Sequence, residues 1–336
     1  MRTGRVLAYV FATSIFVIIL VSLLPSEVTR IHSDGVVVLD SLYTFDETVT
    51  RMQQILERSS FLSSHSLSIA ARDSFDGTVL ATVAYVKFAG PTTRQLILDR
   101  QSVLVELPQR IAVTRDKQFR KVQVAIFDTS WMQKRHHSEY TSAYSAIGKM
   151  MLGLAKDIAG YPPLSHMANV ENDSLVVPPP ANSRNVNDQP PVEGIEDVVF
   201  DCTSCIALVA EQLKSSLEKH GFTELHLHFF VEPPTLPFSK VSVMMHDAMS
   251  PMLRTRPMAS LDWPISFSVH EKHGLAKKRV VVQVTKAEWA HRRHHIAGHG
   301  ANVALLDAAI DAVLDDLRKI NTLLPRPPPF VRMDPT

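Results

Sequence analysis

Two short runs of arginine and histidine are the residues of this chain best suited to chemistry. Arg135-His136-His137 and Arg293-His294-His295 have the same order, and 294 − 136 gives an offset of 158 positions. Imidazole changes its protonation near neutral pH and can act as a general base or as a metal ligand. A carboxylate close to an imidazole could support proton transfer during catalysis. If the chain is an enzyme, the candidate catalytic residues are Glu106, Asp128 and His136.

A metal site is the second possibility that the histidines raise. His291, His295 and His299 recur every four residues, and His294 lies between them. If this segment is helical, three imidazoles share one face and could hold zinc or copper. The arginines interleaved with them disfavour a bound cation. The sequence therefore favours a basic, solvated connection between the last strand and the last helix, with His291, His294 and His295 as the candidate metal ligands.

Both cysteines lie in one short motif, Cys202-Thr203-Ser204-Cys205, where a helix is expected to begin. A helix N-terminus lowers the pKa of a thiol, and the C-x-x-C spacing permits a disulfide that opens and closes. Cys202 and Cys205 are therefore candidates for redox chemistry. No βαβ pattern of the thioredoxin type surrounds the pair, so a structural disulfide in an oxidising compartment is the alternative.

The composition and the motifs narrow the function classes. The net charge is +1 and 21% of the residues are charged, so the chain has no field that would draw nucleic acid. The sequence contains no nucleophile elbow, phosphate loop, dinucleotide glycine pattern or zinc-protease motif, and it implies no particular cofactor. We therefore favour a non-catalytic module that binds a small molecule or a protein. An enzyme, or a metal or thiol-redox protein, is the alternative.

The histidines belong to a longer block that occurs twice, which predicts two copies of one domain. Residues 121–124 precede Trp131, and residues 279–282 precede Trp289, again at an offset of 158. A repeat of this length indicates a duplicated domain rather than a solenoid unit. We expect each tryptophan to anchor a strand to a helix within the core of its own copy.

Each copy has the periodicity of two amphipathic helices and a sheet. In the first copy, an apolar stripe predicts a helix over 45–58, and Thr44 and Glu47 form a capping box at its start. The other predicted elements are strands over 36–39, 67–71, 79–88, 105–114 and 122–127 and a helix over 142–159. This order is β-α-β4-α. Two helices on one face of an antiparallel sheet bury that face economically, so the predicted fold class is α+β.

Several of these segments resemble a known family. The helix that begins with Phe45-Asp46-Glu47-Thr48-Val49, the strand with Leu107-Pro108, and Trp131 followed by Arg135-His136 are similar to the domain-of-unknown-function family 302. The resemblance implies a β-α-β4-α domain of the TATA-binding-protein-like fold type, which often pairs as a dimer. It covers 34–160 and, more weakly, 196–322.

The expected domain organisation follows from the repeat. The first repeat domain occupies 34–160 and the second occupies 195–323. A linker rich in proline and asparagine covers 161–194, and a proline-rich tail covers 324–336. Because domains resembling this family pair, we predict that the two repeats form an internal pseudo-dimer.

The N-terminal segment predicts the compartment. Val6 to Leu24 is uncharged, largely apolar and close to the roughly 20 residues that span a bilayer, and Arg2 and Arg5 precede it. We favour an uncleaved signal anchor over a cleaved signal peptide. Residues 1–5 would then be a cytoplasmic stub of a single-pass membrane protein in type II orientation, with both domains lumenal or extracellular. The glycosylation sequon at Asn172 suits a secretory compartment.

Overall fold

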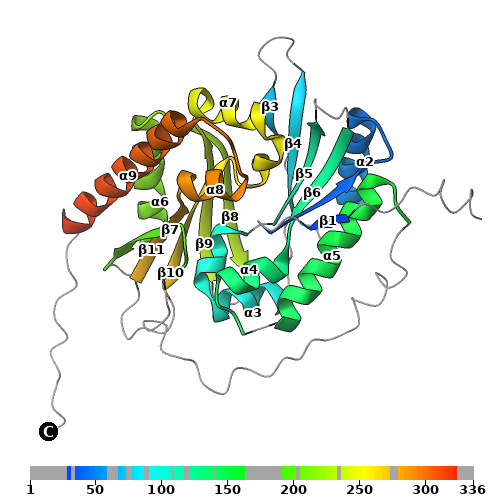
Figure 1. Cartoon of the computed structure of the whole chain (residues 1–336). Coiled ribbons are helices and arrows are strands. Elements are labelled where there is room, and N and C mark those ends of the chain that lie inside the picture. The colour runs from blue at the N-terminus through cyan, green and yellow to red at the C-terminus, as the bar shows by residue number, and fades with distance from the viewer. Residues whose placement is uncertain are drawn as a thin grey trace, which may run out of the picture.

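The computed structural model describes most of the two predicted repeats (Figure 1). The described residues are 29–31, 35–58, 67–72, 78–86, 91–107, 109–116, 121–139, 141–162, 191–201, 205–232, 236–272 and 279–323. Within these ranges no helix has the length and apolar character needed to cross a membrane. Four predicted features lie outside the described residues, namely the anchor at 6–24, the sequon at Asn172, Cys202 and the tail at 324–336.

The first half of the chain folds around a six-stranded antiparallel sheet. Its strands, in spatial order, are β1 (Thr29–Ile31), β2 (Val36–Asp40), β6 (Lys121–Phe127), β5 (Gln109–Asp116), β4 (Val79–Val86) and β3 (Leu67–Arg72). The helices α2 (Phe45–Arg58) and α5 (Thr141–Ala159) pack against this sheet and against each other. Ile111, Val113 and Val124 are fully buried in the resulting core.

The start of α2 has the capping box that the sequence predicts. Thr44 N donates to Glu47 Oε2 over 3.0 Å, and Glu47 N donates to Thr44 Oγ1 over 3.4 Å. Together these bonds satisfy two amides that the helix itself leaves without partners. The buried residues Phe45, Met52 and Leu56 then recur at helical spacing and face the core.

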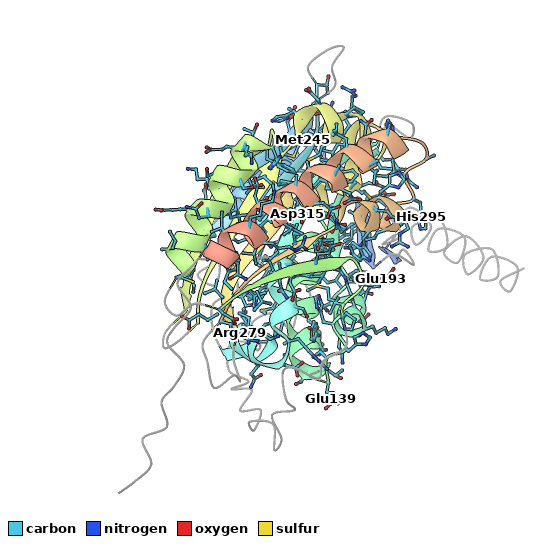
Figure 2. The ribbon with its side chains drawn as sticks, turned by 90° about the vertical axis from the view of Figure 1, so that its left-hand side faces the viewer. Glu139, Glu193, Met245, Arg279, His295 and Asp315 are labelled. Carbon is cyan, nitrogen blue, oxygen red and sulfur yellow. The ribbon has the colours of Figure 1, made fainter. Side chains whose placement is uncertain are left out.

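The second half is built around a five-stranded antiparallel sheet. Its strands, in spatial order, are β7 (Ile195–Phe200), β11 (Arg279–Thr285), β10 (Ile265–Lys272), β9 (Leu236–Met244) and β8 (Thr223–Glu232). The helices α6 (Ile206–Lys219) and α9 (Gly300–Leu323) pack against each other and against this sheet. They lie side by side in Figure 2, where the exposed Asp315 marks α9. The mixed α+β class with antiparallel sheets is therefore confirmed.

Both halves contain helices that the predicted β-α-β4-α order omits. After β4 the first half inserts α3 (Pro91–Asp99) and the 3₁₀ helix η1 (Gln101–Val105), and after β9 the second half inserts α7 (His246–Thr255) and the 3₁₀ helix η4 (Pro257–Leu261). Each last strand is followed by a short helix, α4 (Thr129–Arg135) or α8 (Ala287–Arg293). The strand predicted over 105–114 therefore begins only at Gln109. The apolar residues at its start suit a strand as well as a short 3₁₀ helix, because so short a helix shows no helical periodicity.

Matching glycines precede β2 in the first half and β7 in the second, and they fix how each of these strands begins. Gly35 and Gly194 have φ values of 77° and 72°, a region that favours glycine. A Cβ at Gly35 would overlap the ring of Trp131, and one at Gly194 would overlap the ring of Trp289. The carbonyl of Gly35 accepts from Asp128 N over 2.8 Å, so strand entry and short-helix start are joined by a backbone bond.

The two halves contact each other reciprocally, with their long helices on opposite outer sides (Figure 1). The η1 helix packs on β10 and β11, and η4 packs on β4, β5 and β6. Trp131 and Trp289 have matching positions and contact each other, with ring centroids 5.5 Å apart. Trp289 belongs to the buried core and Trp131 packs against it, so the two rings are core residues that also join the halves. Contacts between matching residues are typical of a two-fold interface.

Candidate functional site

Glu106, Arg135 and His136 lie together where η1 meets α4. Glu106 directly follows η1, and His136 caps the C-terminus of α4. The Arg135 guanidinium donates to Glu106 Oε1, and His136 Nε2 lies 3.7 Å from the same oxygen. Their side chains are 4%, 5% and 0% exposed for Arg135, Glu106 and His136. Such a buried pair is costly to break, because the charge left behind has no solvent.

Burial and pairing set the protonation of this cluster. Burial alone would raise the pKa of Glu106, but Arg135, with help from His136 and Arg293, holds that pKa well below its usual value. Burial lowers the pKa of His136, and the attraction of Glu106 offsets only part of this effect. At neutral pH the cluster therefore holds a carboxylate, a guanidinium and a neutral imidazole.

Ser102, on η1, bonds to the other ring nitrogen of His136. The distance from Ser102 Oγ to His136 Nδ1 is 2.9 Å. A neutral imidazole has one nitrogen that donates and one that accepts. The proton is best placed on Nε2, which faces the carboxylate of Glu106, and Nδ1 then accepts from the Ser102 hydroxyl. Ser102 is thus hydrogen-bonded to His136, and His136 Nε2, which has no hydrogen-bond partner among the described residues, lies 3.7 Å from the Glu106 carboxylate.

The second half has the same residue types in a tighter arrangement. Arg293 Nη1 lies 3.2 Å from both carboxylate oxygens of Asp262, and His294 Nε2 lies 2.6 Å from Asp262 Oδ2. Burial would raise the pKa of Asp262, but Arg293 and His294 lower it below its usual value. Met258 is the second residue of η4, as Ser102 is of η1, so this half lacks the hydroxyl.

The two arginines stack on aromatic rings across the interface between the halves. The Arg135 guanidinium carbon lies 3.6 Å from the ring centre of Trp289, and that of Arg293 lies 4.1 Å from the ring centre of Trp131. Arg293 and His294 are only 6% and 5% exposed. The predicted solvated connection is therefore wrong for these two residues, because a buried carboxylate and the partner half enclose them.

The histidines proposed as metal ligands point to separate partners. His291 Nε2 lies 3.0 Å from Gly298 O, His294 is paired with Asp262, and His295 is exposed with a φ of 48°. The short helix α8 ends before His294, so the three imidazoles do not share a helical face. In the described ranges no group of three or more His, Cys, Asp or Glu side chains is placed to hold a metal.

Asp128 and Cys205 have local roles in the structure. Asp128 Oδ1 accepts from Ser130 N over 2.9 Å, which makes Asp128 the N-cap of α4 rather than a member of the cluster with Glu106 and His136. Cys205 precedes α6 and is disulfide-bonded. Cys202 lies outside the described residues, so the redox hypothesis stays a prediction.

A cavity of about 170 Å³ opens beside Ser102 and His136. Both halves line it: Arg100, Gln101, Ser102 and His136 come from the first, and Pro191, Val192, Ile195, Asp197, His270, Lys272, Val281 and Gln283 lie in or just before the second. Gln101 Nε2 donates to Glu271 O over 3.0 Å and joins the two sides. The Gln283 side-chain oxygen has no hydrogen-bond partner among the described residues. The cavity therefore has polar walls with unused bonding capacity.

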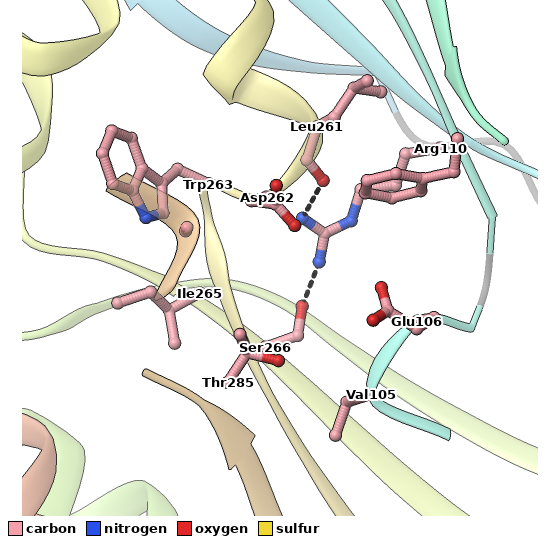
Figure 3. Close-up of a pocket in the computed structure, with 11 residues that line it drawn as sticks. Val105, Glu106, Arg110, Leu261, Asp262, Trp263, Ile265, Ser266 and Thr285 are labelled. Atoms are coloured by element: carbon pink, nitrogen blue, oxygen red, sulfur yellow. Dashed lines mark hydrogen bonds between the residues drawn. The ribbon is translucent and has the colours of Figure 1, made fainter. Parts of the chain in front are cut away.

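Two buried basic side chains lie in the interface between the halves. Arg110 donates to Leu261 O over 2.7 Å and to Ser266 Oγ, beside a space of about 20 Å³ (Figure 3). That space is sufficient for about one water molecule. Lys240 Nζ donates to Val105 O over 2.8 Å and to Leu107 O. These bonds hold the backbone on both sides of Glu106.

Sequence reasoning missed Ser102, Lys240 and Lys272. Lys240 and Ser242 alternate with Val241 and Val243, a pattern that predicts a solvated strand face. In the structure Lys240 and Ser242 are fully buried, because the first half covers this face. No local signal marks Ser102 or Lys272, since the cavity forms only when the halves meet.

The comparisons with known proteins identify no family for the chain. No family model and no curated protein matches it. Among solved structures, an uncharacterized conserved DUF302 protein from Bacillus stearothermophilus aligns at 16% identity and a TM-score of 0.33, over 38% of this chain and 100% of that one. DynU16, from the dynemicin biosynthetic locus, aligns at 9% identity and a TM-score of 0.21, over 85% of this chain and 98% of that one. The di-domain ARO/CYC BexL from the BE-7585A biosynthetic pathway aligns at 8% identity and a TM-score of 0.17, over 86% and 99%.

Proposed function

We propose that this chain is a binding module for a small organic anion, held in the cavity between its two halves. The observation that carries the proposal is the positive, polar lining of this cavity. Arg100 and Lys272 face one acidic lining residue, the exposed Asp197, among the described residues. No described carboxylate pairs with Lys272. A bound anion would supply that missing counter-charge.

The size and the polar groups of the cavity restrict the ligand further. A cavity of about 150 Å³ is large enough for a benzene molecule, so about 170 Å³ suits a ligand with one ring or a short chain. The unpartnered oxygen of Gln283 calls for a donor on the ligand, because a buried acceptor without a partner costs free energy. The favoured class is a small acid that also carries a hydroxyl or an N–H group.

The proposed site depends on pairing of the two halves. We propose that they are copies of a DUF302-like domain of the TATA-binding-protein-like fold type, paired within one chain. The common order of elements and the reciprocal contacts support this. We also keep the sequence-based hypothesis that the anchor at 6–24 holds both halves on the lumenal or extracellular side.

Ligand recovery from the full-length chain tests this proposal. The protein is purified in mild detergent, and small molecules released by denaturation are identified by untargeted mass spectrometry. We expect a small acid in stoichiometric amount from the wild type. Lys272→Met should lower its recovery at least tenfold, because the substitution removes a cation and keeps most of the side-chain volume.

Lys319→Met is the matched control, because Lys319 is 77% exposed and distant in sequence from the cavity residues. It should retain the acid at the wild-type level. Recovery of the same acid from wild type and Lys272→Met would contradict the proposal. Recovery of neutral molecules alone would contradict it as well.

A further inference from the structure

We propose that Ser102 is a nucleophile activated by His136, and that these two residues hydrolyse esters of small acids bound in the cavity. Ser102 Oγ lies 2.9 Å from His136 Nδ1, and both residues line the cavity of about 170 Å³. Serine hydrolases use a hydroxyl bonded to an imidazole with a carboxylate on the far side of the ring, and here the Glu106 carboxylate lies 3.7 Å from His136 Nε2. Here the two ring nitrogens have exchanged roles, since Nδ1 faces the hydroxyl.

Comparison with the second half indicates that Ser102 is not needed for packing of the carboxylate, arginine and histidine cluster. Asp262, Arg293 and His294 form their buried cluster with Met258 at the position of Ser102. That cluster is the tighter of the two, with His294 at 2.6 Å from its carboxylate against 3.7 Å for His136. A cluster of these residue types therefore packs without a hydroxyl at this position, whereas in the first half the Ser102 hydroxyl bonds to His136 beside the cavity.

The proposed reaction balances with water as the second substrate. Ser102 Oγ attacks the ester carbonyl carbon while its proton passes to His136 Nδ1. The resulting imidazolium gives that proton to the departing alkoxide, so an alcohol leaves and Ser102 stays acylated. Water then attacks the acyl group, its proton passes through Nδ1 to Ser102 Oγ, and the acid is released. Glu106 is a positioning residue whose carboxylate, 3.7 Å from Nε2, stabilises the transient imidazolium electrostatically.

The substrate class rests on the proposed function of the cavity. Lys272 and Arg100 would bind a carboxylate on the substrate, and a hydroxyl or N–H group of the substrate would donate to the side-chain oxygen of Gln283. The cavity then suits a half-ester of a short dicarboxylic acid that also carries such a donor, or an ester of similar size with one negative charge. The nucleophile itself requires only Ser102 and His136, so the two proposals can fail separately.

A fluorophosphonate probe tests the nucleophile in the full-length chain. Such probes form a covalent bond to an activated serine, and peptide mass spectrometry locates the adduct. We expect the adduct on Ser102. We expect none on Ser145, an exposed serine of α5. Ser102→Ala should abolish labelling, and Ser145→Ala should leave it unchanged. Absence of an adduct on Ser102, or equal labelling of Ser145, would overturn the proposal.

The pH dependence of labelling separates an activated serine from an accessible one. Burial lowers the pKa of His136, so its base form persists through neutral pH and the rate should fall only well on the acid side of about 6.5. This readout needs no variant of the buried histidine. A rate that instead climbs steadily above pH 9 would show an unassisted hydroxyl and overturn the proposal.

Two chromogenic esters complete the test. 4-Nitrophenyl acetate is neutral, and mono-4-nitrophenyl succinate carries a carboxylate. Ser102→Ala should slow hydrolysis of both by about 100-fold or more. Lys272→Met should reduce only the preference for the succinate ester. If Lys272→Met loses the preference for the succinate ester while Ser102 is still labelled, both proposals are supported. Equal rates of hydrolysis by the wild type and Ser102→Ala would overturn the assignment of Ser102 as the nucleophile.

Discussion

Glu106 and Asp262 occupy matching positions, yet they hold their histidines differently. Asp262 binds His294 directly over 2.6 Å, whereas Glu106 is shared with Arg135 and leaves His136 at 3.7 Å. His136 instead places Nδ1 2.9 Å from Ser102 Oγ. Of the two histidines, His136 is the one that lines the cavity of about 170 Å³.

Lys240 is the residue whose burial has the clearest consequence for pH dependence. It is fully buried, and burial holds its pKa well below the usual value, with the charge of Arg110 lowering it further and Glu106 opposing. The unfolded chain keeps a lysine pKa near 10.4. Between the folded and the unfolded pKa, the unfolded state binds more protons, so stability rises with pH in that window.

We therefore predict that Lys240→Met removes a pH-dependent contribution to stability. The free energy of unfolding of the wild type relative to Lys240→Met should rise as the pH approaches about 10.4 from below, by at most about 1.4 kcal/mol per pH unit. Urea unfolding at several pH values measures this difference. Lys319→Met, an exposed control, should follow the wild type. Parallel curves for wild type and Lys240→Met would mean that Lys240 stays charged in the folded state.

At the scale of elements, periodic segments are the part of the fold that sequence can predict. The helix over 45–58 and the strand over 122–127 follow from residues spaced at 3.6 and 2. The η1 helix has five residues, too few for any period, and its buried Val103 and Leu104 pack where β10 and β11 of the other half contact it. Its conformation depends on residues more than 150 positions away.

In the candidate site, too, some residues can be found from local sequence patterns and others only from the folded chain. The shared spacing of arginine and histidine draws attention to His136, and the matching carboxylates draw attention to Glu106. Asp128 looks equally suitable in the sequence, but its place at the start of α4 makes it a cap. Ser102 and Lys272 have no local pattern, because β10 of the second half and η1 of the first become neighbours only in the folded chain.

Gly35, which directly precedes β2, provides a test at the scale of elements. Gly35→Ala should lower the free energy of unfolding by about 2–4 kcal/mol, because φ is positive there and the new Cβ would overlap Trp131. Thermal or urea unfolding measures the loss. Gly300→Ala is the matched control, since a Cβ at Gly300 meets nothing within 4 Å. It should change stability by no more than about 1 kcal/mol. Equal effects of the two substitutions would contradict the assigned role of Gly35.

At the scale of the whole molecule, the two halves share a buried interface that contains basic side chains. Arg110 and Lys240 are 4% and 0% exposed, and both cross from one half to backbone carbonyls of the other. Unpaired, each half would expose its basic side chain, the carbonyls bound by the other, and the ring of Trp131 or Trp289. Pairing is therefore expected to contribute to the stability of both halves.

We predict that separate halves associate when they are produced together. Fragments 29–162 and 191–323, co-expressed as two chains, should co-purify in equal amounts. Trp289→Ala should weaken the association at least tenfold, because it removes the ring under Arg135 and against Trp131. Leu305→Ala, at a side chain that is 54% exposed, is the control and should not change it. Two monomers that do not co-purify would contradict the interpretation.

The crossed stacking of arginine and tryptophan has a consequence for how such a chain can evolve. Arg135 rests on Trp289 and Arg293 rests on Trp131, so a change in either half alters the surroundings of a buried charge in the other. Neither half is free to change alone at these positions, and substitutions there must be compensated across the interface. Positions 102 and 258 lie outside this crossed stacking, and there the two halves carry different residues, serine and methionine. A change at such a position can therefore alter one half while the other keeps the scaffold intact.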